Sequence, residues 1–519
     1  MATAVKDQLF RLIKSLNKAE KRNFKLYARR SHNQEDSLYI RLFDLLARLD
    51  SPDDEAVLRR LRLTPGKYSN LKRHLYNQLL TSLRLIYIDK EIDIELREQI
   101  DFAHILYGKG LYLDSLRILE RAKARAVEHS RDLLHLEILE FQKLIEARHV
   151  TFSRQVENKM DLLVNESARR SYSVLNTSEL FNINIQIHGR FIESGHSRNA
   201  AERRAAEEFW HDIQTPHIDR TTATHTFHQK INRFQAAMWY HHIQLDFAAA
   251  LENALQALNL FKVNRAMTVK DPDLYLRSLY YTITFGYLTD DQPLMARRLR
   301  ELQTFLSDGN VKLNPNSQNI GLIYAYLSEV NDRFAVQDWV GARAVSERVR
   351  SEYERPDAPF RPNHNRWSLF LYKEAVGRFM TGDLDGALGN LNEVLSYPGS
   401  ILSPELLLNV RLLMAVIFYE TDNSTLLDYS LTNISRQLRK SRSDAKAYRA
   451  VLAALRQLNR SLPQDRTAIF EQLTQLLDRL ESKPYERKAL LNFDGRRWAE
   501  RHLRGSLARR PATDVPFRA

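Results

Sequence analysis

The 519-residue chain contains no cysteine, which excludes disulfide bonds, zinc sites with thiolate ligands and a cysteine nucleophile. Glycine and proline number only 16 and 15, well below their average usage of about 7% and 5%. Few turns are available, so the secondary-structure elements must be long. No P-loop, Rossmann fingerprint, Gly-x-Ser-x-Gly or kinase signature is present. We therefore expect a binding protein without a cofactor, and not an enzyme.

Strand signals and long apolar runs are also missing. No alternating run of β-branched residues is bounded by turn signals. The longest apolar patch, 412–419, is far shorter than the ~20 residues that span a bilayer. Lys6, Arg11 and Lys14 interrupt the amino-terminal segment, which lacks the pattern of a signal peptide. We expect a cytoplasmic protein without a membrane partner.

Helical periodicity is present nearly throughout. Apolar residues recur three, four and seven positions apart, as in Leu406, Val410 and Leu413. Hydrophobic residues make up 44% of the chain, which is ample for a buried core. The sequence therefore predicts an all-α fold.

The clearest local pattern lies in residues 99–126. One helix is expected to end near Gly108, and a following glycine can adopt the left-handed backbone of a helix end. A second helix then places small and apolar residues on one face, so that the two helix axes can approach closely. The residues that carry this pattern are Ala103, Gly110, Tyr112, Ser115, Leu119 and Ala122. We predict a helical hairpin in which Tyr112 is largely buried and none of these residues touches a ligand.

Copies of the pattern recur downstream. The best copy is 382–395, similar ones are 246–257 and 338–345, and degenerate ones begin at Asp290 and Asp422. Their signature residues are Phe247, Ala250, Trp339, Ala342, Gly382, Leu384 and Ala387. The spacing predicts a period of about 45 residues, longer than the standard repeat of about 34. An all-helical protein with chance turns is the alternative.

The small residue, the Gly-x-Tyr turn and the apolar ladder together resemble the tetratricopeptide repeat. This resemblance implies a right-handed superhelix of helical hairpins, a scaffold whose concave groove holds a peptide or helix of another protein. The segment 14–25, Lys-Ser-Leu-Asn-Lys-Ala-Glu-Lys-Arg-Asn-Phe-Lys, resembles the start of a group of bacterial proteins with tetratricopeptide-type repeats, which implies no particular activity.

Positive charge is concentrated at the two ends. Residues 1–90 carry 19 Lys and Arg against 10 Asp and Glu, and residues 434–519 carry 20 against 9. We therefore predict a basic amino-terminal helical module (1–90), a tetratricopeptide-like stack (91–433) and a basic carboxy-terminal helical cap (434–519) with a flexible tail from about residue 505. Solvated helix faces and a frayed tail would also account for the charge.

The first module could bind nucleic acid. A helix over 53–63, a break at 64–69 and a basic helix over 70–87 could form a DNA-reading helix-turn-helix. Its phosphate contacts would be Arg59, Arg60, Arg62, Lys67, Lys72 and Arg73, and its base contacts His74, Asn77 and Gln78. The apolar face of the second helix and the long turn favour an end cap for the stack instead.

Six histidines lie between His211 and His242. His225 and His228 could share a helix face, but a zinc site needs a third ligand, so no metal site is predicted. The expected function is a protein-protein interaction scaffold. The alternative is a nucleic-acid-binding regulator whose repeats sense a signal or bind a partner; the sequence leaves the partner's identity open.

Overall fold

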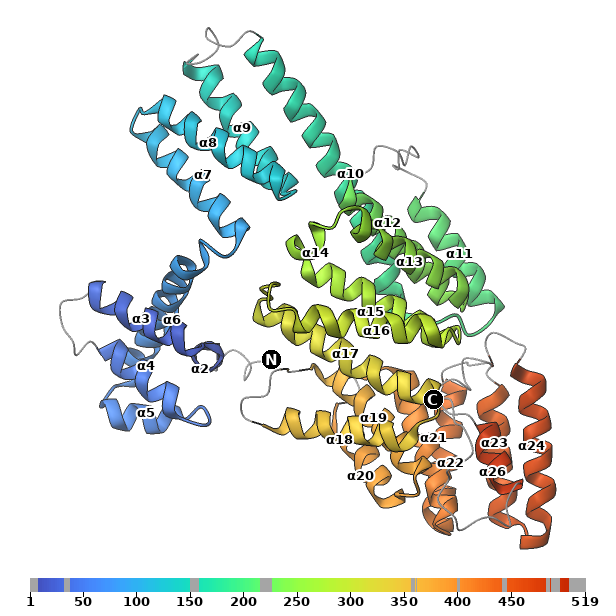
Figure 1. Ribbon diagram of the computed structural model, residues 1–519. Helices are drawn as coiled ribbons and strands as arrows, with labels where there is room; N and C mark the ends of the chain where they lie inside the picture. Colours follow the sequence, from blue (N-terminus) through green and yellow to red (C-terminus); the bar gives the residue numbers. More distant parts are fainter. Residues whose placement is uncertain are drawn as a thin grey trace. The chain divides into compact units, whose positions relative to one another are not determined.

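The computed structural model describes residues 8–31, 38–149, 158–214, 226–355, 360, 362–398, 402–440, 446–481, 486 and 495–503. These residues form helices joined by short connections, and none of them lies in a β-strand (Figure 1). The prediction of an all-α fold is confirmed for this part of the chain. No helix among the described residues is long and apolar enough to cross a membrane. The tail predicted from residue 505 lies outside the described residues.

The chain divides into two compact units, residues 1–175 and 176–519. The helices of the first unit are α2 (Gln8–Ser15), α3 (Lys18–Ser31), α4 (Leu38–Arg48), α5 (Asp54–Leu61), α6 (Pro65–Tyr87), α7 (Ile92–Gly108), α8 (Tyr112–Glu128) and α9 (Asp132–His149). The long helix α10 (Lys159–Ser194) contains the boundary between the units.

The first unit holds two separate hydrophobic clusters, one within α2–α6 and one within α7–α9. A capping box is present at the start of α3, where Asn17 and Glu20 each accept a hydrogen bond from the other's backbone N–H, at 2.9 and 2.8 Å. The predicted break at 64–69 is wrong. Helix α6 begins at Pro65, because proline suits the first helical position and Thr64 caps the helix.

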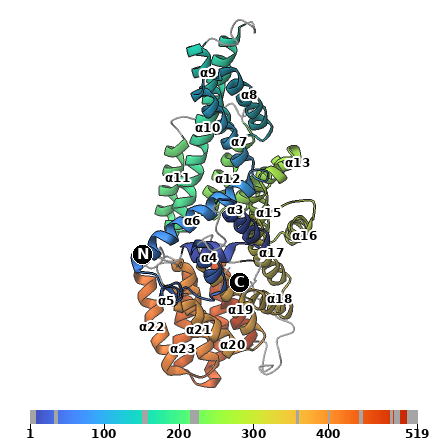
Figure 2. The same ribbon diagram turned by 90° about the vertical axis from the view of Figure 1, so that its left-hand side faces the viewer.

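The second unit contains the remaining helices. They are α11 (Ala200–Gln214), α12 (Phe227–Ile243), α13 (Phe247–Val263), α14 (Met267–Lys270), α15 (Pro272–Leu288), α16 (Gln292–Ser307), α17 (Pro315–Ala335), α18 (Trp339–Glu354), α19 (His364–Met380), α20 (Leu384–Ser396), α21 (Pro404–Glu420), α22 (Ser424–Lys440), α23 (Lys446–Arg460), the 3-10 turn η2 (Pro463–Asp465), α24 (Arg466–Glu481) and α26 (Gly495–Leu503). From α12 to α22 they pair into hairpins that stack in chain order, as both ribbon views show (Figures 1 and 2).

One turn geometry joins the helices of most hairpins. A single residue after the first helix adopts a left-handed backbone, with φ between 53° and 86°. The next N–H then donates to the carbonyl five residues earlier, at 2.8–3.0 Å, which satisfies the helix end. The left-handed residues are Gly110, Ser130, Leu245, Asp290, Gln337, Gly382 and Asp422. In the second unit they recur at intervals of 40 to 47 residues, close to the predicted period of about 45.

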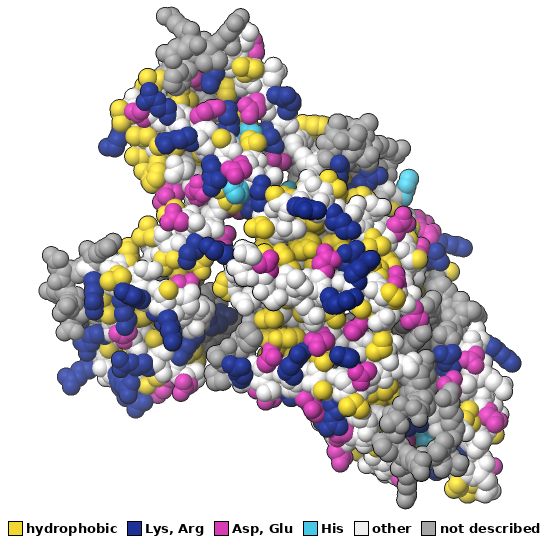
Figure 3. Space-filling view, in the orientation of Figure 1, with side chains coloured by type: hydrophobic (Ala, Val, Ile, Leu, Met, Phe, Trp, Pro, Cys, Tyr) yellow, Lys and Arg dark blue, Asp and Glu magenta, His cyan; other side chains and the backbone are white. Residues whose placement is uncertain are grey.

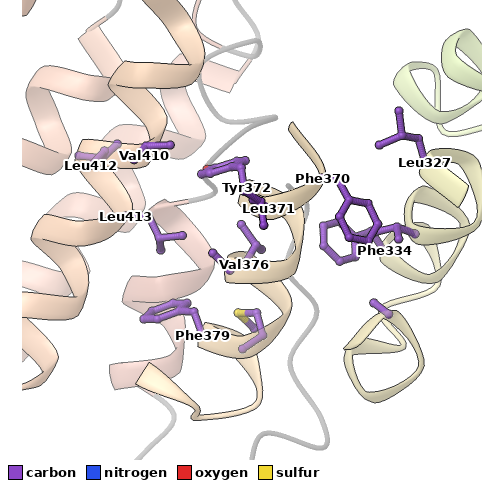
Figure 4. Close-up of a cluster of buried hydrophobic side chains, with 14 of the residues drawn as sticks. Leu327, Phe334, Phe370, Leu371, Tyr372, Val376, Phe379, Val410, Leu412 and Leu413 are labelled. Atoms are coloured by element: carbon purple, nitrogen blue, oxygen red, sulfur yellow. The ribbon is translucent and has the colours of Figure 1, made fainter. Parts of the chain in front are cut away.

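The main hydrophobic core of the second unit runs between successive hairpins. Helix α19 lies at its centre: Phe370 is directed towards α17, whereas Tyr372 and Phe379 are directed towards α21 (Figure 4). The same cluster continues through α22, α23 and α24 to Trp498 in α26. Residues on both sides of the predicted boundary at 433 therefore share one core.

Helix α19 also buries two charged side chains. Glu374 is fully buried and accepts hydrogen bonds from Arg350 of α18 and from Arg378, with closest distances of 2.9 Å in both cases. Its neighbour Lys373 makes no ion pair or hydrogen bond with the described residues, and its ammonium lies 5.2 Å from the ring centre of Phe334. Burial lowers the pKa of Lys373 to about 8.

Candidate functional site

The hairpin signature of residues 99–126 lies in the contact between α7 and α8. Helix α7 ends at Gly108 as predicted, and Gly110 has a φ of +79°. Ser115 is fully buried, and its hydroxyl donates to the carbonyl of Ala103 at 2.8 Å, so the two helix backbones approach closely there. Ala103, Leu119 and Ala122 are buried in the same cluster.

Tyr112 departs from the prediction because it is only half-buried. Its ring stacks on His149 at the end of α9, with the ring centres 3.6 Å apart, and it approaches Tyr107 at 5.6 Å. The aromatic side chain therefore covers the end of the next helix instead of filling the hairpin core.

The downstream signature residues are mostly core residues as well. Six of the seven lie in helices, and Gly382 lies in a turn with a φ of +86°. The buried ones are Phe247, Ala250, Trp339, Ala342 and Ala387, and Leu384 is partly buried against the core. The signature marks how hairpins are built, and it contributes no free surface for a ligand.

Basic side chains gather on the surface of α3, α4 and α5, at the left of the view (Figure 3). Of the six predicted phosphate contacts, Arg59, Arg60, Arg62, Lys67 and Arg73 are exposed. Lys72 is engaged instead: its ammonium lies 3.1 Å from a carboxylate oxygen of Asp54. Lys21, Arg22, Lys25, Leu26 and Arg29 line an open hollow on α3.

Helices α5 and α6 are separated by only three residues, 62–64, so the turn has the length usual in a helix-turn-helix. The objection that the turn is too long is therefore wrong. Of the predicted base contacts, His74 and Asn77 are exposed, whereas Gln78 is half-buried and accepts a hydrogen bond from Tyr27 at 3.0 Å. Helix α6 also buries Leu75 and Leu79, as the end-cap interpretation expects.

A groove that the sequence signature does not mark lies among the last helices of the stack. Its volume is about 730 Å³, and its walls come from three consecutive helices. The lining residues are Leu395 of α20, Arg411, Met414 and Phe418 of α21, and Leu426, Tyr429, Ser430, Asn433, Arg436 and Gln437 of α22. On α21 and α22 these positions follow helical spacing, so each helix presents one continuous face to the groove.

The chemistry of this α20–α22 groove is apolar with a basic rim. Tyr429 is 69% exposed and Leu426 is 43% exposed, both high values for large apolar side chains. Arg411 donates to Gln437 at 2.6 Å, and Arg436 has no hydrogen bond or ion pair within the described residues. No carboxylate lines the groove. It therefore suits a ligand with an apolar face and negative charge beside it.

Sequence reasoning missed this groove because its lining residues belong to the ordinary helical periodicity. The spacing of Arg411, Met414 and Phe418 identifies one helix face, but it cannot distinguish a face that packs on a neighbour from one that borders a groove. The available signal is the pair Leu426 and Tyr429, two large apolar residues on the otherwise polar face of an amphipathic segment.

No group of three or more His, Asp or Glu side chains that could hold a metal ion occurs among the described residues. His228 lies 3.8 Å from a carboxylate oxygen of Asp271, and His225 lies outside the described residues.

Comparison of the chain with protein-family models, with curated proteins and with solved structures finds no match.

Proposed function

We propose that this protein is an interaction scaffold, a tetratricopeptide-like superhelix of helical hairpins that binds an amphipathic helix of another protein. The repeated left-handed turn and the stacking of hairpins in chain order support the superhelix. The observation that carries the binding role is the α20–α22 groove, which leaves large apolar side chains exposed beside unopposed arginine. The proposal is a binding protein and not an enzyme.

The dimensions of the groove support a helical occupant. From Leu426 to Gln437 the lining of α22 extends over about three helical turns, roughly 16 Å. A helix that binds in such a groove uses apolar residues at i, i+3 or i+4, and i+7, which span about 10 Å and fit within that length. Arg411 and Arg436 at the rim would meet Asp or Glu on the flank of that helix, which gives the complex its specificity and orientation.

Selection from a displayed library of amphipathic helices tests this proposal. Enriched peptides should carry apolar residues at the helical spacing with acidic residues beside them. Arg436→Glu should weaken their binding about tenfold or more, because the rim would then repel the acidic flank. Arg439→Glu is the matched control, since Arg439 is exposed on the same helix but does not line the groove. Equal binding to both variants, or no enrichment, contradicts the proposal.

The amino-terminal module offers a second candidate function, nucleic-acid binding, with the repeats as the partner-binding part of a regulator. Two observations favour it: the turn between α5 and α6 is three residues long, and Arg59, Arg60, Arg62 and Lys67 have no partner among the described residues. Exposed cations of this kind bind phosphate by releasing counterions.

Duplex-DNA binding by the intact protein at several salt concentrations tests this second candidate. We expect an affinity that falls steeply with salt. Replacement of Arg59, Arg60, Arg62 and Lys67 by glutamine should reduce the salt slope by about 3 to 4, roughly 0.9 for each lost phosphate contact. Absence of binding at low salt would end this candidate, and an unchanged slope in the variant would place any binding elsewhere.

A further inference from the structure

A second polar cluster of the second unit involves tyrosines and arginines of three consecutive hairpins. Arg366 of α19 donates to the hydroxyl of Tyr280 of α15 at 2.9 Å. Its guanidinium also lies 5.3 Å from the ring centre of Tyr280 and 5.8 Å from that of Tyr324 of α17. The two tyrosine rings are stacked 4.1 Å apart at an angle of 9°. One arginine therefore covers the edge of a tyrosine pair that joins neighbouring hairpins.

A second arginine lies near the same tyrosines. Arg277 of α15, an exposed residue, stands one turn before Tyr280 and Tyr281 on the same helix face. Burial opposes the rise, but Tyr281 and Tyr324 raise the pKa of its guanidinium. Neither Arg277 nor Arg366 has a carboxylate within ion-pair distance among the described residues. Asp273, one turn before Arg277, accepts instead from the side-chain amide of Asn316 at 3.0 Å. Two positive charges thus lie near these tyrosines without a counterion among the described residues.

This cluster contains more hydrogen-bond donors than acceptors. The oxygen of Tyr280 accepts from Arg366, so the Tyr280 hydroxyl proton is left to donate, and the Tyr324 hydroxyl donates no hydrogen bond to the described residues. Tyr281, next to Tyr280, adds a third hydroxyl, and the charge of Arg277 acts on it. Guanidinium groups have donors only. No acceptor within the described part of the chain is engaged by these three hydroxyl protons, so the cluster combines unused donors with positive charge.

We propose that Arg277 and Arg366, with the hydroxyl groups of Tyr280, Tyr281 and Tyr324, bind a compact oxyanion, a phosphate or carboxylate group. The arginine fork matches the paired oxygens of either group, and charge-assisted hydrogen bonds of this kind are the strong ones. A phosphate monoester fits best, because it offers three acceptor oxygens and close to two negative charges at neutral pH. This site is separate from the α20–α22 groove, so either proposal can fail without the other.

The pKa of His188 in α10 depends on the charge of this site. Burial and then the charges of Arg277 and Arg366 lower the pKa of His188. Its ring stacks on Trp239 of α12, with ring centres 4.2 Å apart. A bound dianion would offset the two arginine charges, so it should raise the pKa of His188. A ligand that binds elsewhere would leave this pKa unchanged.

Titration of the intact protein with inorganic phosphate, and separately with N-acetylaspartate, tests the proposal by calorimetry and by the NMR titration of His188. We expect phosphate to bind more tightly than the carboxylate and to raise the pKa of His188. Arg277→Gln should weaken phosphate binding about tenfold or more. The matched control is Arg297→Gln on α16, an exposed arginine in the next helix, which should bind as the unmodified protein does.

Tyr281→Phe provides the second variant, because it removes one hydroxyl and preserves the ring. It should weaken binding by a few-fold while thermal stability is retained. Tighter binding of N-acetylaspartate than of phosphate would assign the site to carboxylates and support the oxyanion proposal. Equal affinities of Arg277→Gln and Arg297→Gln, or an unchanged pKa of His188 at saturation, would overturn it, and so would an absence of binding at millimolar concentrations. The cluster would then be a cation–π contact between hairpins only.

Discussion

Replacement of Gly382 by alanine isolates the contribution of the left-handed turn. Gly382 has a φ of +86°, and a Cβ atom added there would meet no other atom within 4 Å. The effect is therefore purely one of backbone conformation. A left-handed backbone costs a residue with a Cβ atom about 1–2 kcal/mol, and alanine regains about 0.4–1 kcal/mol by restricting the unfolded chain. The net expectation is a loss of roughly 0.5–1 kcal/mol of unfolding free energy.

Two further substitutions serve as controls, one at a helical glycine and one at an equivalent turn. Gly389→Ala lies seven residues later within α20, where an added Cβ atom also meets nothing but the backbone is helical; the same chemical change should stabilise the protein by about 0.5–1 kcal/mol. Gln337→Gly, at the equivalent turn with a φ of 66°, should stabilise it by a similar amount, roughly 0.5 kcal/mol or more.

Urea denaturation followed by circular dichroism measures the unfolding free energy of each variant. Hydrogen exchange of the α20 amides measures the free energy of local opening at this hairpin. If Gly382→Ala is as stabilising as Gly389→Ala, the shared turn does not hold the hairpin and the reasoning is refuted.

Three predictions concern buried contacts. Ser115→Trp should overpack the α7–α8 contact, lower the unfolding free energy by at least about 1–3 kcal/mol and reduce hydrogen-exchange protection through α9. Leu113→Trp, at an exposed position in the same turn of the helix, should have neither effect. Lys373→Met should stabilise the protein at pH 7 by about 1–3 kcal/mol, because the amine is charged in both states at that pH and the folded chain buries this charge without an ionic partner. Between pH 8 and about 10.5 the unfolded chain still binds a proton that the folded chain has released, so the stability of the unmodified protein should rise relative to this variant; parallel urea midpoints across that range would contradict the burial argument. Glu374→Ala should cost about 2–4 kcal/mol, since two arginines lose a fully buried partner, whereas Glu207→Ala at an exposed pair should cost under about 1 kcal/mol; equal urea midpoints would contradict this.

The hairpins were predictable where glycine or a capping residue marks the turn. Gly110 and Gly382 were identified because few other residues adopt a left-handed backbone readily. At the equivalent turns stand Leu245 and Gln337, whose side chains give no such signal, so tertiary packing imposes the conformation. The start of α6 is hard to place from the sequence because Pro65-Gly66 is typical of a turn, although proline is also a favoured first residue of a helix.

The candidate sites were less predictable, because they join residues that are distant in the chain. Leu395 and Tyr429 border one groove from different hairpins, and Arg366 of α19 meets a stacked tyrosine pair from α15 and α17. A single sequence records the helical face of each residue, but it does not record which faces meet. The exposed arginines of α5 were recognisable as charges, whereas the pairing of Lys72 with Asp54 depends on how α5 lies against α6.

Photocrosslinking from the groove tests the central claim most directly. A benzoylphenylalanine residue in place of Tyr429 would lie at the mouth of the groove, and the same residue in place of Val340, a 72% exposed position on α18, is the control. Crosslinking in the cells that make the protein should attach the Tyr429 position to one segment of another protein, with apolar residues at helical spacing and acidic residues beside them. The Val340 position should not yield this product. The same products from both positions, or a crosslink from Tyr429 only to a second copy of this chain, would contradict the proposal that the groove holds a partner's helix.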